Sequence, residues 1–295
     1  MTETLPRFLT TKELAELLRI GERKVYDLAT SGEVPCTRVV GKLLFPRGEI
    51  EAWIAQARSG PAAIEPLPAI VAGSHDPLLE WSLRQSGSGL AAFMDGSMDG
   101  LERMARRECA ASGTHIHEAD GQWNAETTAR LLVGKPVVLV EFARRSRGLI
   151  LPKGNPENVA GIADLAGRRF AQRQPGAASQ VWFEELAKES GLDPQGLSFA
   201  ANPARSEMDV ALAVLDGKAD AAFGLESMAR QFRLKFLPIA QERYDLAVWR
   251  QAYFEPAMQA LMRFLGTGEF RQHAAGMGGY DTSAAGTVHY NAGGL

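Results

Sequence analysis

The chain has 295 residues, of which 45% are hydrophobic and 23% are charged, and its formal net charge is −3. This composition is typical of a globular protein with more than one domain. The negative net charge excludes a protein that is basic over its whole surface, so any surface that binds nucleic acid must be a local basic patch. The sequence has no apolar run of transmembrane length, no signal-peptide pattern, and two cysteines, Cys36 and Cys109, that lack metal-ligand spacing. We therefore expect a cytoplasmic protein with free thiols and no membrane partner.

Residues 1–57 carry the pattern of a small helical domain. Thr10 and Glu13 have the spacing of a capping box, which predicts a helix over about 11–19. A second helix is expected over about 22–30, and Gly32 is expected to end it in a left-handed conformation.

A hairpin follows the second expected helix, with strands over about 37–40 and 43–45. A third helix is expected over 47–57, with Ile50, Trp53 and Ile54 on one face. The order of helix-turn-helix, two-stranded wing and helix predicts a winged helix-turn-helix domain, mainly α.

Basic side chains gather on the second expected helix and on the wing. Such groups clamp phosphates and reach base edges in recognition helices, although a packing domain with solvated charges would look the same on charge alone. The expected DNA-binding residues are Arg23, Lys24, Tyr26, Arg38 and Lys42.

Longer motifs make this pattern specific. The segments Leu9-Thr-Thr-Lys-Glu-Leu-Ala-Glu-Leu-Leu-Arg-Ile, Glu22-Arg-Lys-Val-Tyr and Val39-Val-Gly-Lys-Leu-Leu-Phe-Pro resemble the excisionase/MerR-type winged helix-turn-helix. The resemblance covers nearly all of residues 8–54 and implies a DNA-binding fold with Arg23, Lys24 and Tyr26 at the DNA. The long dimerising helix of MerR-type regulators is absent, so a homodimer or higher oligomer on double-stranded DNA would have to form through the second domain.

A stretch over 58–68, rich in Ala, Gly, Ser and Pro, predicts a linker. From residue 69 to 295, strands alternate with helices, which predicts an α/β domain with a mainly parallel sheet. Separate strands are expected over 137–142, 148–151, 234–239 and 245–249. The chain is expected to form two lobes with a cleft between them, lobe one over about 69–144 and 240–295 and lobe two over about 145–239.

Polar residues follow the predicted strands, at the edge where α/β folds bind their ligands. The segment from Arg169 to Leu186 reads as a strand, a turn at Pro175-Gly176 and a helix beginning near Ala178, and such a helix N-terminus can bind an anion. The expected ligand-binding residues are Ser74, His75, Asp76, Ser97, His115, His117, Arg173, Ser179, Tyr280 and Asp281.

This second domain resembles the periplasmic-binding-protein-like domain of cytoplasmic regulators, which is also found fused to molybdopterin-biosynthesis proteins and molybdate-type regulators. The motifs that carry the resemblance include Gly73-Ser-His-Asp-Pro, Gly96-Ser-Met-Asp-Gly-Leu, Arg173-Gln-Pro-Gly-Ala-Ala-Ser and Gly279-Tyr-Asp-Thr-Ser. Family members usually have Gly-Ser-Gly-Thr-Arg at the turn where this chain has Gly176-Ala-Ala-Ser-Gln, so the usual ligand does not transfer directly.

Alternative roles remain for several of these residues. Ser74, Ser97 and Ser179 also fit helix N-caps, and His75 could share a metal site with either His115 or His117, although ligand hydrogen bonding is favoured over a metal. Asp76 and Glu118 could form an acid–base pair, but no catalytic motif such as a nucleophile elbow or a P-loop is present. We predict no catalytic residues and no metal site.

The sequence thus predicts an N-terminal winged helix-turn-helix, mainly α, followed by an α/β two-lobed periplasmic-binding-protein-like domain. The favoured function is a ligand-responsive transcriptional regulator with no cofactor other than a bound solute such as molybdate, tungstate, a pterin-like compound or a carboxylate metabolite. The alternatives are a non-DNA-binding protein or enzyme of molybdenum cofactor assembly, and an architectural DNA-binding protein whose second domain has lost its ligand.

Overall fold

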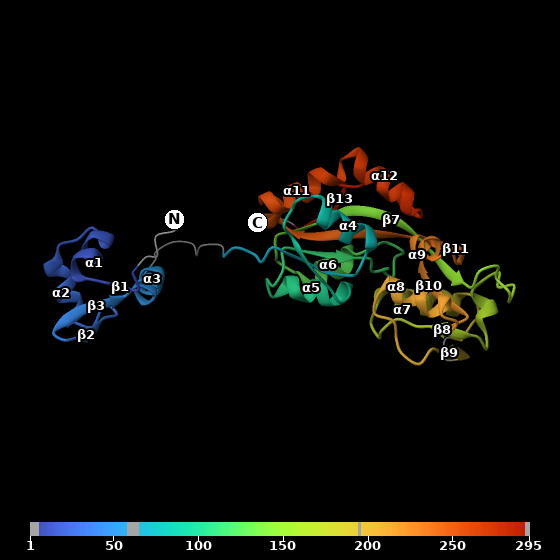
Figure 1. Cartoon of the computed structure of the whole chain (residues 1–295), viewed down its shortest axis with the longest axis horizontal. Coiled ribbons are helices and arrows are strands. Elements are labelled where there is room, and N and C mark those ends of the chain that lie inside the picture. The colour runs from blue at the N-terminus through green and yellow to red at the C-terminus, as the bar shows by residue number, and fades with distance from the viewer. Residues whose placement is uncertain (1–5, 58–64, 194–195, 293–295) are drawn as a thin grey trace. The chain divides into compact units, whose positions relative to one another are not determined.

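The structure is a computed structural model that describes residues 6–57, 65–193 and 196–292. The chain divides into two compact units, Met1–Pro66 and Leu67–Leu295 (Figure 1). Most of the predicted linker, residues 58–64, lies outside the described residues. No helix in the described part of the chain is long and apolar enough to cross a membrane.

The first unit is the predicted winged helix-turn-helix. Its elements are β1 (Phe8–Leu9), α1 (Thr11–Leu18), α2 (Glu22–Thr30), β2 (Thr37–Val39), β3 (Lys42–Pro46) and α3 (Arg47–Gln56). The strands form an antiparallel sheet in the order β1-β3-β2. The predicted capping box is confirmed, since the Thr10 hydroxyl accepts from the Glu13 N–H while the Glu13 carboxylate accepts from the Thr10 N–H.

A small apolar core holds this unit together. Leu14 of α1, Val25 of α2, Phe45 of β3 and Ile50 of α3 are fully buried against one another. Ile54, expected on the face of α3 that also carries Ile50 and Trp53, is 39% exposed. The core therefore fixes the angle between α1 and α2 and leaves the polar faces of α2 and of the wing in solvent.

The second unit begins with strand–helix repeats and continues into longer strands. The elements up to the middle of the unit are β4 (Ile70–Gly73), α4 (Pro77–Gln85), β5 (Ala91–Met94), α5 (Ser97–Ala105), β6 (Ala111–Thr114), α6 (Ala125–Leu131), β7 (Val137–Leu151), η1 (Ile162–Leu165), β8 (Arg169–Ala171) and α7 (Ala178–Glu189). The remaining elements are β9 (Ser198–Phe199), α8 (Glu207–Leu215), β10 (Ala221–Leu225), α9 (Glu226–Gln231), β11 (Lys235–Trp249), α10 (Arg250–Tyr253), α11 (Pro256–Leu265), α12 (Gly268–Met277), β12 (Tyr280–Asp281) and β13 (Val288–Asn291).

The sheet of this unit is mixed, which corrects the expectation of a mainly parallel sheet. The strand order is β5-β4-β6-β11-β7-β10-β8-β9, and β12 and β13 also pair with β7. The outer pairs, such as β4 with β5 and β8 with β10, are parallel, but β7 is antiparallel to β10, β11, β12 and β13. The parallel strands belong to strand–helix repeats, and the antiparallel ladder joins them in the middle.

Two long strands run through the whole unit. The separate strands expected over 137–142 and 148–151 are one strand, β7, and those expected over 234–239 and 245–249 are likewise one strand, β11. In the sequence, the polar run Arg144-Arg-Ser-Arg147 looks like a loop between two strands. In the structure, this run is part of β7, because β11 pairs with it along its whole length. Figure 1 shows β7 and β11 crossing between the two halves of the unit.

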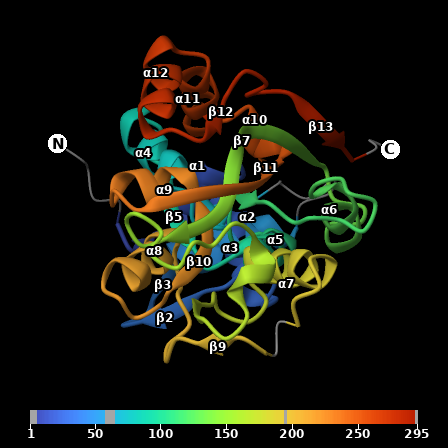
Figure 2. The same ribbon diagram turned by 90° about the vertical axis from the view of Figure 1, so that its right-hand side faces the viewer.

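Separate hydrophobic cores define the two lobes on either side of this crossing. Lobe one has a core that includes Val71, Leu101, Phe142, Tyr244 and Leu261. Lobe two has cores on both faces of its sheet, one around Phe170 and Phe183 and the other around Val210 and Met228. The helices α11 and α12 cover lobe one, while α7, α8 and β9 belong to lobe two (Figure 2).

Glycine at two strand ends allows the backbone of lobe one to close tightly where polar residues gather. Gly73, the last residue of β4, has a φ of +108°, and a Cβ atom there would lie 2.2 Å from the Gly113 carbonyl oxygen. A Cβ atom on Gly113 would lie 1.8 Å from the Tyr244 hydroxyl oxygen. Gly73 thus lets the end of β4 lie close to β6, and Gly113 leaves room for the Tyr244 hydroxyl to reach the Ser74 carbonyl.

Candidate functional site

The middle of β7 carries two buried arginines on one face. Side chains alternate along a strand, so Arg145 and Arg147 point to the same side while Arg144 is exposed. Glu242 of β11 lies directly opposite Arg145 in the ladder, and Tyr280 of β12 lies opposite Arg145 on the other side. The crossing strands therefore place two guanidiniums and one carboxylate at the junction of the lobes.

Six charged side chains form a continuous series of ion pairs through this junction, which we call the ionic chain. Its members alternate in sign in the order Asp76, Arg145, Glu242, Arg147, Glu207 and Arg173, and each is at most 7% exposed. The nitrogen–oxygen distances along the series are 2.9, 2.6, 2.9, 2.9 and 2.9 Å. Three positive and three negative charges compensate one another, which burial of so many charges requires.

At the lobe-one end, His115 joins the ionic chain to the turn after β4. Its Nδ1 lies 3.0 Å from the Glu242 carboxylate, and its Nε2 lies 2.9 Å from the Ser74 hydroxyl oxygen. The His115 backbone N–H donates to the Ser97 hydroxyl, and Tyr244 donates to the Ser74 carbonyl. Ser74, Ser97 and His115 are thus brought together at the carboxyl ends of β4 and β6.

Asp76 has two roles at this end. One carboxylate oxygen accepts from the Leu79 N–H and caps helix α4, and the other accepts from Arg145 at 2.9 Å and from the Tyr280 hydroxyl at 2.8 Å. Residues far apart in the sequence, at 76, 145 and 280, therefore meet at one carboxylate.

At the lobe-two end, the turn from β8 to α7 holds Arg173. The Arg173 guanidinium donates to the Glu207 carboxylate at 2.9 Å and to the Arg205 carbonyl at 3.0 Å. Its backbone N–H donates to the side-chain oxygen of Gln180 at 2.9 Å. Gln180 therefore closes the turn, and the charge of Arg173 is already compensated by Glu207.

Burial and charge shift the pKa values of these groups in opposite directions. Burial alone would raise the pKa of the Glu207 carboxyl, but the guanidiniums of Arg147 and Arg173 outweigh it and hold that pKa at about 2. Arg145 and Arg147 likewise keep the pKa of Glu242 far below its usual range despite burial. Burial lowers the pKa of His115, and the neighbouring Glu242 only partly opposes this, so His115 is neutral near neutral pH.

The lowered pKa of Glu207 predicts how its contribution to stability depends on pH. A carboxyl group whose pKa falls from 4.5 to about 2 on folding contributes about 3 kcal/mol above its unfolded pKa, and this contribution is lost as the pH falls towards 2. The free energies of unfolding of the wild type and of Glu207→Gln should therefore differ most near pH 7, and the difference should shrink as the pH falls from about 4.5 to about 2. Urea titrations at several pH values measure this difference, and a difference that stays constant with pH would contradict the assignment.

Several predicted site residues lie apart from the ionic chain. His75, which precedes α4, contacts Glu80 of that helix at 3.2 Å, and Asp281 is exposed. Ser179 is buried at the second position of α7. Glu118, which could have paired with Asp76, instead accepts from the N–H and the hydroxyl of Thr127.

The alternative reading of the three serines as helix N-caps is wrong. The N-caps of α4, α5 and α7 are Asp76, Gly96 and Ala177. Ser74 lies before the cap, whereas Ser97 and Ser179 lie inside the first turn of their helices.

His117 connects the lobes by a contact of a different kind. Its ring stacks on Trp182 of α7 at 5.4 Å between centroids and meets the edge of Trp123 at 5.1 Å. Its Nδ1 lies 3.3 Å from the carboxylate of Glu185, which also belongs to α7. His117 and Trp123 follow β6 in lobe one, so this aromatic contact holds that loop against lobe two.

Four donors of the ionic chain, three Nε atoms and Nη2 of Arg145, have no hydrogen-bond partner among the described residues. The three Nε atoms are those of Arg145, Arg147 and Arg173, and all four donors are buried. The 2.6 Å contact of Arg145 with Glu242 is an ion pair that lacks the geometry of a hydrogen bond. Buried donors of this kind favour acceptor oxygens from a bound molecule.

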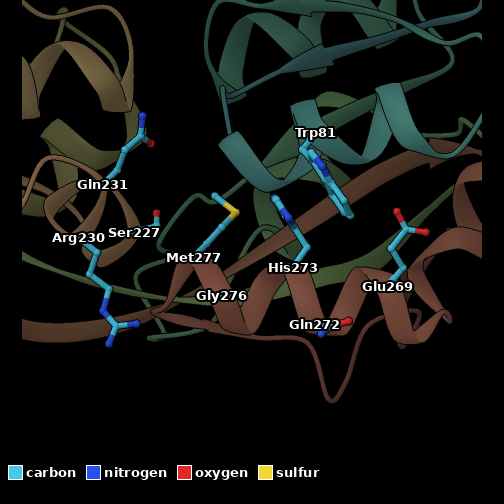
Figure 3. Close-up of a pocket in the computed structure, with 9 residues that line it drawn as sticks. All are labelled: Trp81, Ser227, Arg230, Gln231, Glu269, Gln272, His273, Gly276 and Met277. Atoms are coloured by element: carbon cyan, nitrogen blue, oxygen red, sulfur yellow. The ribbon is translucent and has the colours of Figure 1, made fainter.

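A cavity of about 660 Å³ lies elsewhere in the second unit, between α4, α9 and α12 (Figure 3). Trp81 and His273 stack against each other in its wall at 3.7 Å between ring centroids. Ser227, Arg230 and Gln231 of α9 form the opposite wall. The residues of the ionic chain and the predicted ligand-binding residues do not line this cavity.

In the first unit, the five predicted DNA-binding residues are all exposed. Arg23, Lys24 and Tyr26 lie on α2, Arg38 lies on β2 and Lys42 begins β3. The four cations among them form no salt bridge with a described residue. They are therefore available to an external anion such as a phosphate backbone.

The described residues contain no group of three or more His, Cys, Asp or Glu side chains placed to hold a metal ion. His115 in particular uses both ring nitrogens for contacts within the protein.

The fold and the sequence define the class of protein. Residues 8–58 match a helix-turn-helix domain, and residues 80–266 match the PBP superfamily domain. The chain belongs to the PBP superfamily domain family, with a helix-turn-helix domain at its N-terminus.

Two proteins are similar to this chain in sequence. The chain is 27% identical over 300 residues to the uncharacterized protein YvgK of Bacillus subtilis (strain 168), covering 95% of this chain and 96% of that protein. It is 30% identical over 109 residues to an uncharacterized protein from the 5′ region of a ferredoxin 2Fe-2S gene of Clostridium pasteurianum, covering 37% of this chain and 96% of that protein.

A similar solved structure is a putative phosphate ABC transporter substrate-binding protein with bound phosphate from Clostridium perfringens. It aligns with a TM-score of 0.54 at 12% identity, over 70% of this chain and 96% of that chain. At this identity, the similarity shows the fold of the second unit.

Sequence reasoning did not single out Arg145, Arg147, Glu207 and Glu242 as site residues. A signal existed for the two arginines, because charged residues two apart inside an apolar strand lie on one face and need buried partners. Glu242 begins the segment Glu242-Arg-Tyr-Asp-Leu, which is a further part of the resemblance to the periplasmic-binding-protein-like domain. Glu207 had no comparable signal, since it reads as an ordinary acidic residue at the beginning of a capped helix.

Proposed function

We propose that the chain is a one-component transcriptional regulator. The helix-turn-helix unit binds double-stranded DNA through α2 and the wing, and the two-lobed unit binds a small polar solute at the junction of its lobes. The solute changes DNA binding by favouring one arrangement of the lobes over another, since a ligand shifts an equilibrium only through differential affinity.

One observation supports this proposal above the others. A unit with unpaired, exposed cations on a recognition helix is joined in one chain to a unit whose lobe junction buries polar donors without protein acceptors. The first arrangement suits a phosphate backbone, and the second suits a solute with acceptor oxygens. We propose a role without catalysis, because Asp76, Glu207 and Glu242 are each engaged by a guanidinium and none is held as a free acid or base.

An oxyanion such as molybdate or tungstate is a candidate solute, and an organic metabolite is a second. The resemblance to molybdate-type regulators and the three guanidiniums at the lobe junction favour the oxyanion. The three carboxylates that already pair with these guanidiniums favour the organic solute. We further propose a cytoplasmic homodimer or higher oligomer on a two-fold-symmetric DNA site, the arrangement usual for helix-turn-helix regulators.

Thermal unfolding of the full chain tests the solute, with molybdate, tungstate, sulfate, phosphate, pterins, polyols, amino acids and small carboxylates as probes. A ligand at about 100 times its dissociation constant should add roughly 2.7 kcal/mol to the free energy of unfolding, which raises the melting temperature by a few degrees. The same solute should change the affinity of the full chain for DNA fragments selected from a random pool. A chain that selects no DNA, or whose DNA affinity no stabilising solute changes, would rule out the regulator.

A further inference from the structure

Glu207 occupies the position that an anionic ligand of the lobe junction would be expected to take. Its carboxylate contacts Arg147 at 2.9 and 3.3 Å in a bidentate arrangement and contacts Arg173 at 2.9 Å. Two guanidiniums that converge on one carboxylate form the arrangement by which proteins bind carboxylates and phosphates. Here, however, the carboxylate belongs to the protein.

The fold holds Glu207 firmly at this position. It is the first residue of α8, where the helix dipole favours a negative charge, and the reciprocal capping of Ser206 and Asp209 fixes the beginning of the helix. Its side chain is only 1% exposed. An incoming anion would have to displace a carboxylate that both helix and arginines stabilise.

The rest of the ionic chain leaves no spare positive charge. Arg145 and Arg147 share Glu242, and Arg145 also contacts Asp76. A bare oxyanion at the lobe junction would therefore add negative charge to a group of side chains whose charges already cancel, at short distance from carboxylates. The unpartnered Nε atoms of the three arginines nevertheless remain available to acceptor oxygens.

Building on the proposed function, we propose that Glu207 determines the specificity of this site by acting as a built-in anion that excludes oxyanions. The site then takes a solute that offers acceptor oxygens without net negative charge, such as a polyol, an amide or a zwitterion. Selectivity comes from a repulsive element inside the site, which is a recognised way to reject a competing ligand.

Replacing Glu207 with glutamine tests this inference, because glutamine keeps the size of the side chain and removes its charge. Sodium molybdate, sulfate and phosphate are titrated into the wild-type full chain and into Glu207→Gln at constant ionic strength, and thermal unfolding and calorimetry are recorded. We expect no shift in the wild type and a saturable shift in the variant, with affinity for molybdate raised roughly 10- to 100-fold. Glu157→Gln is the matched control, since Glu157 is an exposed carboxylate of lobe two that pairs with Arg168 away from the ionic chain, and it should gain no affinity.

Two results would overturn the inference. One is binding of any of the three oxyanions by the wild type with the affinity of the variant, and the other is a folded Glu207→Gln variant that gains no oxyanion binding. If circular dichroism shows that the variant is unfolded, the inference is tested on the wild type alone. A rise in the melting temperature of the wild type with molybdate overturns the inference. A rise with a polyol or a zwitterion, but with none of the oxyanions, supports it. Oxyanion binding by the wild type would contradict the role of Glu207 but not the proposed function as a regulator. A chain that selects no DNA would contradict the proposed function as a regulator but not the role of Glu207.

Discussion

Replacing Glu242 with glutamine is expected to destabilise the second unit by about 3–5 kcal/mol, the usual cost of removing one partner from a buried ion pair. Glu242 lies within 3.0 Å of Arg145, Arg147 and His115, so its neutral replacement leaves two buried guanidiniums without their shared carboxylate. This loss is a large fraction of the total stability of about 5–15 kcal/mol that is typical of a folded domain. Urea unfolding of the wild type and the variant, followed by the fluorescence of Trp123 and Trp182, measures this loss in the free energy of unfolding.

The matched control for this prediction is Glu102→Gln. Glu102 is a half-exposed carboxylate that lies 4.0 Å from Arg106, and exposed ion pairs of this kind contribute at most about 1 kcal/mol. A loss below about 1 kcal/mol for Glu242→Gln would mean that the ion pairs at the lobe junction do not carry the stability assigned to them.

Changing both Arg23 and Lys24 to alanine is expected to weaken DNA binding roughly 10- to 100-fold at about 100 mM salt. Both side chains are exposed on α2 and lack ion-pair partners among the described residues, so they can neutralise phosphates without first breaking an internal contact. Each phosphate contact that is lost should also reduce the slope of log affinity against log salt by about 0.9. Fluorescence anisotropy with a duplex selected by the wild type, at salt concentrations from about 50 to 200 mM, measures both quantities.

A variant with the same change in net charge provides the control. Arg84→Ala combined with Lys218→Ala removes two exposed cations from the second unit, and it should leave the slope unchanged. An equal loss of affinity in both double variants would mean that net charge, and not the recognition helix, governs binding to DNA.

Local patterns allowed most of the first unit to be predicted. The capping box of Thr10 and Glu13, the turn at Gly32 and the alternation of the wing each act over a few residues, so sequence spacing is sufficient to recognise them. The core of this unit includes Ile50 and Phe45, whereas Ile54 is exposed.

The second unit shows where sequence reasoning is insufficient. Strand-end residues such as Ser74, Asp76 and His115 could be picked out individually, because their turns follow recognisable strands. Their partners could not be assigned, because they lie far along the chain. Asp76 contacts Arg145 and Tyr280, which follow it by 69 and 204 positions, and His115 contacts Glu242, which follows it by 127 positions. The arginines of β7 look like a solvated loop until the ladder with β11 shows that they are buried in the middle of a strand.

The alternating order of the ionic chain also has an evolutionary consequence. Each inner member, from Arg145 to Glu207, has a neighbour of opposite sign on both sides, so changing any one of them alone leaves a buried charge without compensation at a cost of several kcal/mol. A lineage can therefore alter these positions only in coordinated pairs, or after other substitutions have raised the stability of the unit. The six residues, spread from position 76 to position 242, should be inherited together as one block, and a change of ligand should appear as a joint change within that block.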